Sequence, residues 1–310
     1  MIKIFKKNKA RVYELKKISN GSWISLINPT EEEIEYISKK LKVPKDFLTS
    51  VLDEDEKPRI EKEDGVTLVV FRVPYKKYIS NKLKITTLPI GIIITKKNII
   101  TICLKENKII DDFTEGKIKL FSVDKRIRFT LQILARANHY FIKYLNDIEK
   151  EINKTEKSLM KSLRNKEIIS LLQLEKILVY FNTSTVGNDN VLEKISKGKI
   201  INLAEEDEDI LEDIIIETRQ AILMSKIFSN ILSSTMDAYT SVISNNLNIV
   251  MKFLASITII LSIPTIVASI YGMNVKLPLQ TNPHAFFITL LISLILSGSL
   301  AYIFAKKNWL

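Results

Sequence analysis

Residues 253–271 read FLASITIILSIPTIVASIY, and the polar tripeptide Gly272-Met273-Asn274 follows them directly. The run carries no charge and is about as long as a helix needs to cross the hydrocarbon core of a membrane. A second run without Asp, Glu, Lys or Arg, residues 277–305, comes soon after it. Two such runs close together predict a pair of membrane-spanning helices, because one core helix of a soluble protein does not account for both.

Charges beside the two runs indicate the orientation of this pair. Lys252 precedes the first run, and Lys306 and Lys307 follow the second, whereas Lys276 is the single lysine between the runs. Lys and Arg accumulate on the cytoplasmic side of spanning helices. We therefore expect a multi-pass protein of the plasma (inner) membrane, in contact with lipid, with both termini in the cytoplasm and the connecting loop outside.

The region upstream of the first run contains no helix breaker. No Gly or Pro lies between Gly198 and Pro264, which predicts one helix over about 205–271. At 1.5 Å per residue this helix is about 100 Å long, so most of it must stand outside a hydrocarbon layer of about 30 Å. Apolar residues spaced by about 3.5 predict a contact with a partner helix. They are Ile210, Ile214, Ala221, Phe228, Ile231, Ala238, Val242 and Ile249.

The first part of the chain has the pattern of an α/β domain. Residues 66–73, 88–95 and 98–104 are rich in Val and Ile and read as strands. Thr30 and Glu33 form a capping-box pattern that predicts a helix over about 31–42. Residues 117–186 contain no Gly or Pro and have helical periodicity, so we expect a helical hairpin with a turn near Asn165.

Composition restricts the class of protein. The formal charge is +11, but the positive residues are spread along the chain and beside the apolar runs, so a nucleic-acid partner is not indicated. The single cysteine, Cys103, allows no internal disulfide, and its apolar surroundings predict a buried thiol. The basic N-terminus lacks a long apolar core, so we expect no cleaved signal peptide.

Two helices from one chain enclose no path for an ion, so conduction would require several copies around an axis. The first spanning helix is the better candidate to line such a path, because it carries hydroxyl side chains while the second is mostly Leu and Ile. Helix packing is an equally good explanation for any single hydroxyl. Pro264 fits either a polar spot in a pore wall or a simple kink. The hydroxyl residues are Ser256, Thr258, Ser262, Thr265 and Ser269.

Tyr271-Gly272-Met273-Asn274 at the end of the first run, with Lys306-Lys307-Asn308-Trp309-Leu310 closing the chain, resembles the CorA family of magnesium channels. The segment 245–252 is similar to the part of that family's pore helix that enters the bilayer. The resemblance implies an α/β N-terminal cytoplasmic domain, long α-helices forming a stalk, and a two-helix C-terminal transmembrane hairpin, assembled as a homopentameric funnel. The corresponding segments are the α/β domain 1–115, the helical hairpin 116–200, the stalk 201–252, the pore-lining span 253–271, the outer loop 272–284, the second span 285–305 and the basic tail 306–310.

The resemblance also implies roles for particular residues. Gly272, Met273 and Asn274 would form the selectivity filter, with Asn274 as a neutral amide ring that hydrogen-bonds the waters of Mg²⁺, an ion that dehydrates reluctantly. Gly272 would permit a backbone conformation or a close approach that a Cβ hinders. The pore-lining set would be Asp237, Asn248, Met251, Leu254 and Thr265, with Met251 and Leu254 as a hydrophobic gate, and Lys306 and Lys307 would form a basic ring.

Carboxylates crowd the start of the long helix. Seven lie within residues 205–213, and stabilisation of the helix N-terminus suffices to explain them. The resemblance implies a second role, in which Asp213, with Asp209, binds regulatory Mg²⁺ between subunits and favours a closed channel. Leu211-Glu212 replaces the family's usual aromatic-Arg pair, and the loop 275–284 lacks the family's carboxylates.

The leading interpretation is a channel for Mg²⁺ influx, with Co²⁺ and Ni²⁺ as further ions and no organic cofactor. A zinc-transporting member of the same superfamily, which shares the motif, is the alternative. A membrane-anchored enzyme or sensor is a third interpretation. An enzyme is not expected, since the chain has two histidines, His139 and His284, and no Gly-x-Ser-x-Gly turn or phosphate-binding loop.

Overall fold

The computed structural model describes residues 1–7, 12–79, 82–118, 121–161, 165–279 and 281–309. Its helices and strands fall into two compact units, residues 1–233 and 234–310, with the boundary inside helix α6. The elements of the first unit are β1 Ile2–Lys7, β2 Val12–Leu15, β3 Trp23–Ile27, α1 Glu31–Leu41, α2 Lys45–Thr49, η1 Ser50–Leu52, β4 Arg59–Glu63, β5 Val66–Ile79, β6 Lys82–Ile94, β7 Ile99–Cys103, α3 Lys108–Thr114, α4 Arg126–Lys161 and α5 Asn165–Ser196. Helix α6, Glu205–Tyr271, runs from the first unit into the second, which also contains α7, Ala285–Lys306.

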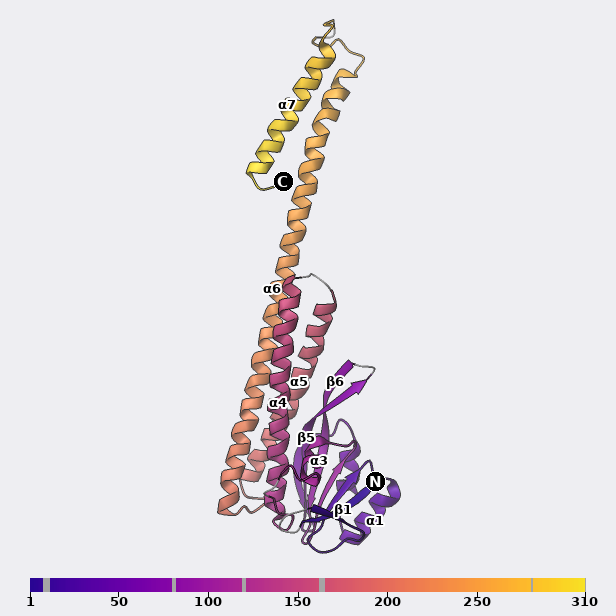
Figure 1. The fold of residues 1–310 in the computed structure, drawn as a ribbon, viewed down its shortest axis with the longest axis vertical. Helices are drawn as coiled ribbons and strands as arrows, with labels where there is room; N and C mark the ends of the chain where they lie inside the picture. Colours follow the sequence, from indigo (N-terminus) through magenta and orange to yellow (C-terminus); the bar gives the residue numbers. More distant parts are fainter. Residues whose placement is uncertain (8–11, 80–81, 119–120, 162–164, 280, 310) are drawn as a thin grey trace. The chain divides into compact units, whose positions relative to one another are not determined.

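Seven strands form one sheet in the order β2-β1-β3-β7-β6-β5-β4 (Figure 1). All neighbouring pairs are antiparallel except β3 and β7, which pair in parallel with Trp23 opposite Ile99. The three strands predicted from the sequence are confirmed as β5, β6 and β7, and β5 and β6 are longer than expected.

Both faces of the sheet are covered. Leu68 and Val70 of β5 belong to a core with α1, α2 and η1, whereas the alternate residues Val69 and Phe71 are equally buried outside that core. Successive side chains of a strand point to opposite faces, and α4 and α5 pack against β5, so they cover the second face. Burial on both faces explains why the strand sequence is a nearly continuous apolar run.

Trp23 is the centre of an aromatic cluster and has no exposed surface. Its ring centroid lies 5.1 Å from those of Phe5 and Phe129, and Phe113 lies 5.2 Å from Phe129. The Trp23 indole N–H donates to Thr101 Oγ1 at 2.9 Å, so its polar group is satisfied. This cluster joins β1, β3, α3 and α4 within one core.

The predicted helices agree with the structure. Thr30 and Glu33 form both hydrogen bonds of the capping box at the start of α1. The two predicted helices are present as α4 and α5, and α5 begins at Asn165 and continues through Gly187, while residues 162–164, next to the predicted turn, lie outside the described residues. Helix α6 has the predicted bounds. Cys103 is buried, as expected.

The apolar stripe predicted for α6 is buried only in part within this one chain. Ile214, Ala221 and Phe228 are buried, but Ile231 and Val242 are 42% and 49% exposed. The buried stripe instead includes polar residues, and it lies within the first unit. Its members are Asp207, Leu211, Ile214, Thr218, Ala221, Ser225, Phe228 and Leu232.

Polar residues are tolerated in this stripe because their hydrogen bonds are made. Thr218 Oγ1 donates to the Ile214 carbonyl at 2.7 Å, and Ser225 Oγ donates to the Ala221 carbonyl at 2.8 Å. Asn138 of α4 donates to Thr218 Oγ1 at 2.6 Å and to the Ile214 carbonyl at 2.9 Å. This contact identifies α4 as a partner of α6 in the first unit.

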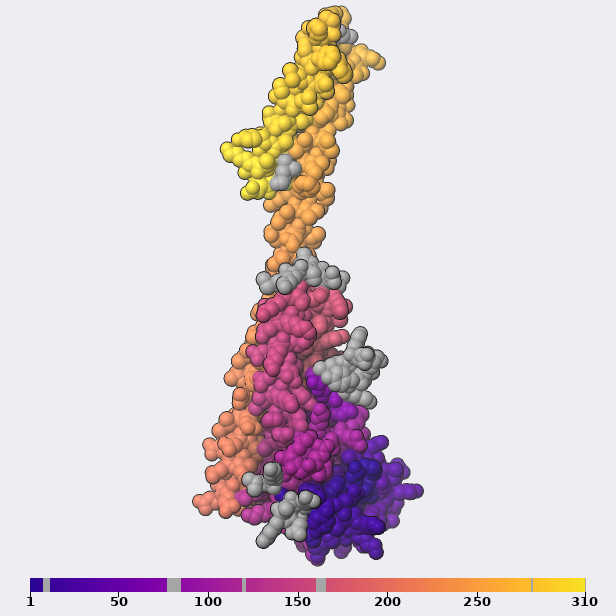
Figure 2. Space-filling view, in the orientation of Figure 1, coloured from indigo at the N-terminus to yellow at the C-terminus, as the bar shows by residue number. Residues whose placement is uncertain are grey.

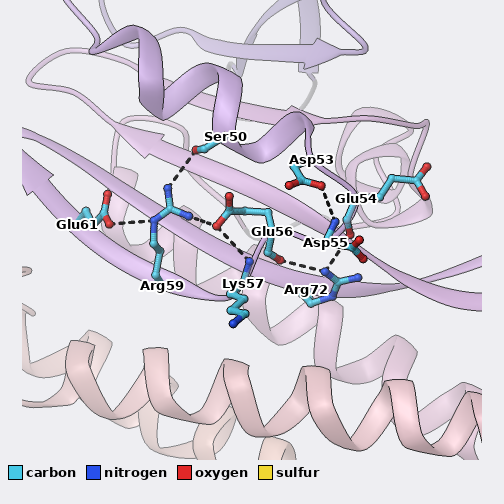
Figure 3. Close-up of polar contacts among 9 residues, drawn as sticks. All are labelled: Ser50, Asp53, Glu54, Asp55, Glu56, Lys57, Arg59, Glu61 and Arg72. Atoms are coloured by element: carbon cyan, nitrogen blue, oxygen red, sulfur yellow. Dashed lines mark hydrogen bonds and ion pairs between the residues drawn. The ribbon is translucent and has the colours of Figure 1, made fainter.

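Arg72 fixes the acidic loop between η1 and β4 (Figure 3). Its guanidinium donates to the carbonyls of Glu54 and Glu56 at 3.0 Å and to the Thr87 carbonyl at 2.8 Å. The Arg72 backbone exchanges two hydrogen bonds with the side chain of Asn188 in α5. Burial lowers the pKa of Arg72. The loop is therefore held to β5, β6 and α5 through one side chain.

Candidate functional site

Helix α6 carries a polar face in the second unit. Asp237, Ser241, Ser244 and Asn248 are spaced by 4, 3 and 4 residues, so they lie on one side of the helix. This face forms a shallow hollow of about 580 Å³. The residues lining it are Asp237, Thr240, Ser241, Ser244, Asn245 and Asn248. Sequence reasoning named Asp237 and Asn248 but missed the other four, which the heptad-like spacing could have identified.

The apolar part of α6 has one side covered within its own unit and one side open. Met251 and Leu254 are 64% and 53% exposed, and Thr265 is also exposed. Ser256 is fully buried, with its hydroxyl donating to the Lys252 carbonyl at 2.8 Å and lying 3.5 Å from the Trp309 carbonyl. Its grouping with the candidate path-lining hydroxyls is wrong, because it faces the chain's own C-terminal segment.

Three of the other hydroxyls of this segment donate hydrogen bonds within the helix. Thr258 donates to the Leu254 carbonyl at 2.9 Å, Ser262 to the Thr258 carbonyl at 2.8 Å, and Thr265 to the Leu261 carbonyl at 3.3 Å. Each oxygen keeps free lone pairs, so it can still accept a hydrogen bond from water. The helix continues through Pro264.

Helices α6 and α7 are both long and apolar enough to cross a membrane, and only 6% of each apolar window is buried. Within the second unit, Figure 2 shows α7 beside the last part of α6. Large apolar side chains such as Phe286 and Phe287, 69% and 67% exposed, lie on α7. Exposed apolar area of this extent indicates contact with lipid or with further protein.

The motif Gly272-Met273-Asn274 lies at the end of α6. The Gly272 N–H donates to the Ala268 carbonyl at 2.9 Å, and a Cβ on Gly272 would lie 3.3 Å from that oxygen. Both contacts are within the last turn of α6 and the φ of Gly272 is not left-handed, so the role expected for Gly272 stays a prediction. Met273 is 56% exposed and Asn274 is exposed, so the amide of Asn274 is open to solvent.

Charged groups are few near the spans. Lys276 lies in the loop after the motif, and Lys306 and Lys307 are exposed at the end of α7. His284 precedes α7, and its backbone N–H donates to Asn282 Oδ1 at 2.9 Å, so its place is at a helix start. Leu310, the last residue of the C-terminal motif, lies outside the described residues.

The acidic start of α6 has a structural partner that sequence reasoning missed. Arg128 of α4 donates to Asp207 at 2.6 Å and to Glu206 at 2.7 Å. The hydrogen bond from Arg128 lowers the pKa of Glu206. No local pattern signals this pairing, because the partners lie in different helices far apart in the sequence.

Asp209 and Asp213 remain exposed on α6. Burial, and then the charge of Asp213, raise the pKa of Glu217 one turn farther along. Within the part of the chain that the structure describes, no three His, Cys, Asp or Glu side chains are grouped to hold a metal ion. A metal ion bound by Asp209 and Asp213 would therefore need further ligands that do not come from the described residues of the same chain.

Comparisons with known proteins agree with this layout. Residues 19–307 match the family of CorA-like Mg²⁺ transporter proteins. The chain is 30% identical over 298 residues to a cobalt/magnesium transport protein CorA from Methanocaldococcus jannaschii, covering 93% of this chain and 91% of that protein. It is 24% identical over 272 residues to the protein of the same name from Thermotoga maritima, covering 85% and 76%.

The fold of the chain also agrees with that of a solved structure. The complete structure of the CorA magnesium transporter from Methanocaldococcus jannaschii superposes with a TM-score of 0.89 at 27% identity, covering 100% of this chain and 99% of that one. The N-terminal sheet domain, the long helices and the two C-terminal apolar helices thus form one known architecture. The family consists of transporters and not of enzymes, as the sequence indicated. With its family match over residues 19–307 and this shared architecture, the chain belongs to the CorA-like Mg²⁺ transporter family.

Proposed function

We propose that several copies of this chain, five by resemblance to the family, surround a path along which hydrated Mg²⁺ crosses the membrane into the cell. The exposed polar face of α6 from Asp237 to Asn248, together with the exposed residues Thr265 in α6 and Asn274 after its end, supports this proposal best. The polar face precedes the apolar span, and inside the span a hydroxyl such as that of Thr265 is less costly beside water than against lipid. In this assembly α7 lies toward the lipid.

The motif would act on the hydrated ion. Mg²⁺ holds its inner waters tightly, and an amide carbonyl can accept hydrogen bonds from those waters without replacing them. The Asn274 side chains of the copies would form a neutral ring at the outer mouth, because their amides are open to solvent. Met251 and Leu254, both largely exposed, would form an apolar constriction that closes by dewetting.

The orientation follows from charge. Lys252, Lys306 and Lys307 lie at one end of the two spans and Lys276 at the other. The positive-inside tendency places both termini in the cytoplasm of a cell whose plasma (inner) membrane contains the protein. Lys306 and Lys307 from all copies would then form a basic ring on the cytoplasmic side, where the Asp237 ring attracts cations.

Intracellular Mg²⁺ would regulate the path. Asp209 and Asp213 are exposed on α6, so their carboxylates are accessible to a metal ion. Mg²⁺ bridging these carboxylates to a neighbouring copy would favour the closed state by its higher affinity for that state. Loss of this Mg²⁺ would release the helices and open the path.

Flux into liposomes tests the proposal. Purified protein should admit Mg²⁺, and Asn274→Ala in every copy should lower the flux at least about tenfold, since each copy loses a hydrogen bond worth about 1 kcal/mol to the hydrated ion. Asn282→Ala, an amide removed from the same loop outside the motif, is the matched control and should retain flux. Equal flux in the wild type and in Asn274→Ala would refute the amide ring.

Two further measurements test the regulation by Mg²⁺ and the choice of transported ion. Asp209→Asn with Asp213→Asn should weaken inhibition by Mg²⁺ on the cytoplasmic side without lowering flux in its absence, and unchanged inhibition would remove these residues from gating. Parallel measurements with Co²⁺, Ni²⁺ and Zn²⁺ should show weaker flux than Mg²⁺. Strong Zn²⁺ flux without Mg²⁺ flux would replace the magnesium proposal with zinc transport.

A further inference from the structure

A hollow of about 550 Å³ lies at one end of the sheet in the first unit. The antiparallel hairpins β4–β5 and β6–β7 bring their turns to the same end, and the parallel pairing of β3 with β7 adds the loop before β3. The end of α1 completes the wall. The residues lining the hollow are Ile18, Ser19, Asn20, Lys40, Leu41, Lys42, Asp64, Gly65, Val66, Thr95, Lys96, Lys97 and Asn98.

The hollow is strongly basic. Lys40 and Lys42 come from the end of α1, Lys96 and Lys97 come from the β6–β7 turn, and Asp64 is the one carboxylate in the lining. Across the residues that the structure describes, none of the four lysines forms an ion pair, although Lys39 beside them pairs with Glu35 at 2.6 Å. Four lysines and one carboxylate in one lining leave an excess of positive charge, which a bound anion would offset.

The side chain of Ser19 is a second, independent indication of a bound anion. Its hydroxyl oxygen is shielded from solvent and has no hydrogen-bond partner among the described residues. The Ser19 carbonyl, in contrast, accepts hydrogen bonds from Ser22 Oγ at 2.7 Å and from Asn98 Nδ2 at 2.6 Å. The backbone is thus fixed while the hydroxyl has no partner, and an oxyanion could satisfy it by accepting a hydrogen bond from it.

The chemistry of the lining selects the class of anion. The lining contains no arginine, so it lacks the planar fork that binds carboxylates in pairs, and lysines bind phosphate as point charges. It also contains no aromatic residue on which a base could stack. We propose that this hollow binds a short polyphosphate chain, either inorganic or as the tail of a nucleotide, with Ser19 and the four lysines as its contacts. The proposal does not depend on the transport activity.

Calorimetric titration of the full-length protein in detergent, in magnesium-free buffer with a chelator, tests it. Inorganic tripolyphosphate and adenosine triphosphate should bind with affinities within about threefold of each other, because base stacking adds nothing here. Adenosine should not bind, citrate should bind more weakly than tripolyphosphate, and the affinity should fall as salt rises. Binding of adenosine, or binding to anionic lipid vesicles without binding of tripolyphosphate, would overturn the proposal.

Variants locate the site. Lys96→Glu with Lys97→Glu should weaken tripolyphosphate binding at least about tenfold. The control is Lys16→Glu with Lys17→Glu, an exposed lysine pair outside the lining, which makes the same change in net charge. Its affinity for tripolyphosphate should stay within about threefold of the wild-type value. Equal losses in the two pairs would assign the binding to overall charge and refute the site. Ser19→Ala keeps all charges and should weaken binding about fivefold, the value of one hydrogen bond, even if the lysine variants do not fold. Unchanged affinity in Ser19→Ala would remove the hydroxyl and with it the proposed site.

Discussion

We expect the stability of the first unit to depend more on the buried carboxylate of Asp112, in α3, than on any other buried charge. Its side chain is 2% exposed and accepts hydrogen bonds from Arg136 Nε and Tyr140 Oη, each at 2.7 Å, with Lys117 Nζ at 3.2 Å from its other oxygen. Burial by itself would raise the pKa of Asp112, but the hydrogen bonds from Tyr140, Arg136 and Lys117 outweigh it, and the pKa lies below its ordinary value.

Asp112→Asn keeps the shape and removes the charge. Breaking a buried ion pair on one side costs about 3–5 kcal/mol. Arg136 and Lys117 are 25% and 59% exposed and can regain water, which reduces the penalty. Asparagine can also still accept a hydrogen bond from Tyr140. We therefore expect the free energy of unfolding to fall by about 2–3 kcal/mol at pH 7.

Urea unfolding of residues 1–233 measures this loss. These residues form one compact unit of the fold, which supports the use of the fragment. Trp23, fully buried, is its one tryptophan, because Trp309 lies beyond it. The control is Asp111→Asn. Burial, together with Glu115, Glu106 and Asp112, raises the pKa of Asp111, so its ionised form is destabilising and the variant should be neutral or slightly stabilising.

The stability that Asp112 contributes depends on pH. Because the folded pKa of Asp112 is lowered, its contribution is fully present above the unfolded value of about 3.9 and is lost as pH falls through the folded pKa. The difference between wild type and Asp112→Asn should therefore be largest near neutrality and shrink below about pH 4. A loss under about 1 kcal/mol at pH 7, or an equal loss in Asp111→Asn, would refute this reasoning.

Two further predictions concern packing and reactivity. A Cβ on Gly187 would lie 2.8 Å from Pro58 Cγ, so Gly187→Leu should lower the free energy of unfolding by about 1–3 kcal/mol in the same urea assay, and wild-type stability would contradict the close contact. Burial raises the pKa of the Cys103 thiol to about 12, so a maleimide at pH 8 should label it at least about a hundredfold more slowly in folded protein than in urea, and equal rates would show that the thiol is accessible.

Local features of the chain could be predicted where one segment contains all the information. The capping box of α1 needs two residues three apart, and the bounds of α6 follow from the acidic start, the absence of Gly and Pro, and the motif after Tyr271. The two spans follow from hydropathy, which depends on composition over about 20 residues. Recognition of the family rested on Gly272-Met273-Asn274 in that context, and the match over residues 19–307 confirmed it.

The tertiary structure decided which residues meet across long separations. The order of the sheet and the parallel pair β3–β7 depend on contacts between strands far apart in the chain, and each strand has the same local pattern whichever neighbour it takes. Arg128 meets Asp207, and Asn138 meets Thr218, because α4 and α6 pack together. The sequence predicted apolar residues along the buried side of α6. Polar Thr218 is nevertheless buried there, because its hydroxyl donates a hydrogen bond to the Ile214 carbonyl.

The same distinction applies to the candidate site. Spacing alone places Asp237, Asn248 and Met251 on one side of a helix, because a helix repeats every 3.6 residues. Only the packing of the second unit excluded Ser256, which lies against the C-terminal segment. Sequence determined what the helix carries on each side, while tertiary contacts determined which side stays open, because burial depends on a partner surface that periodicity does not specify.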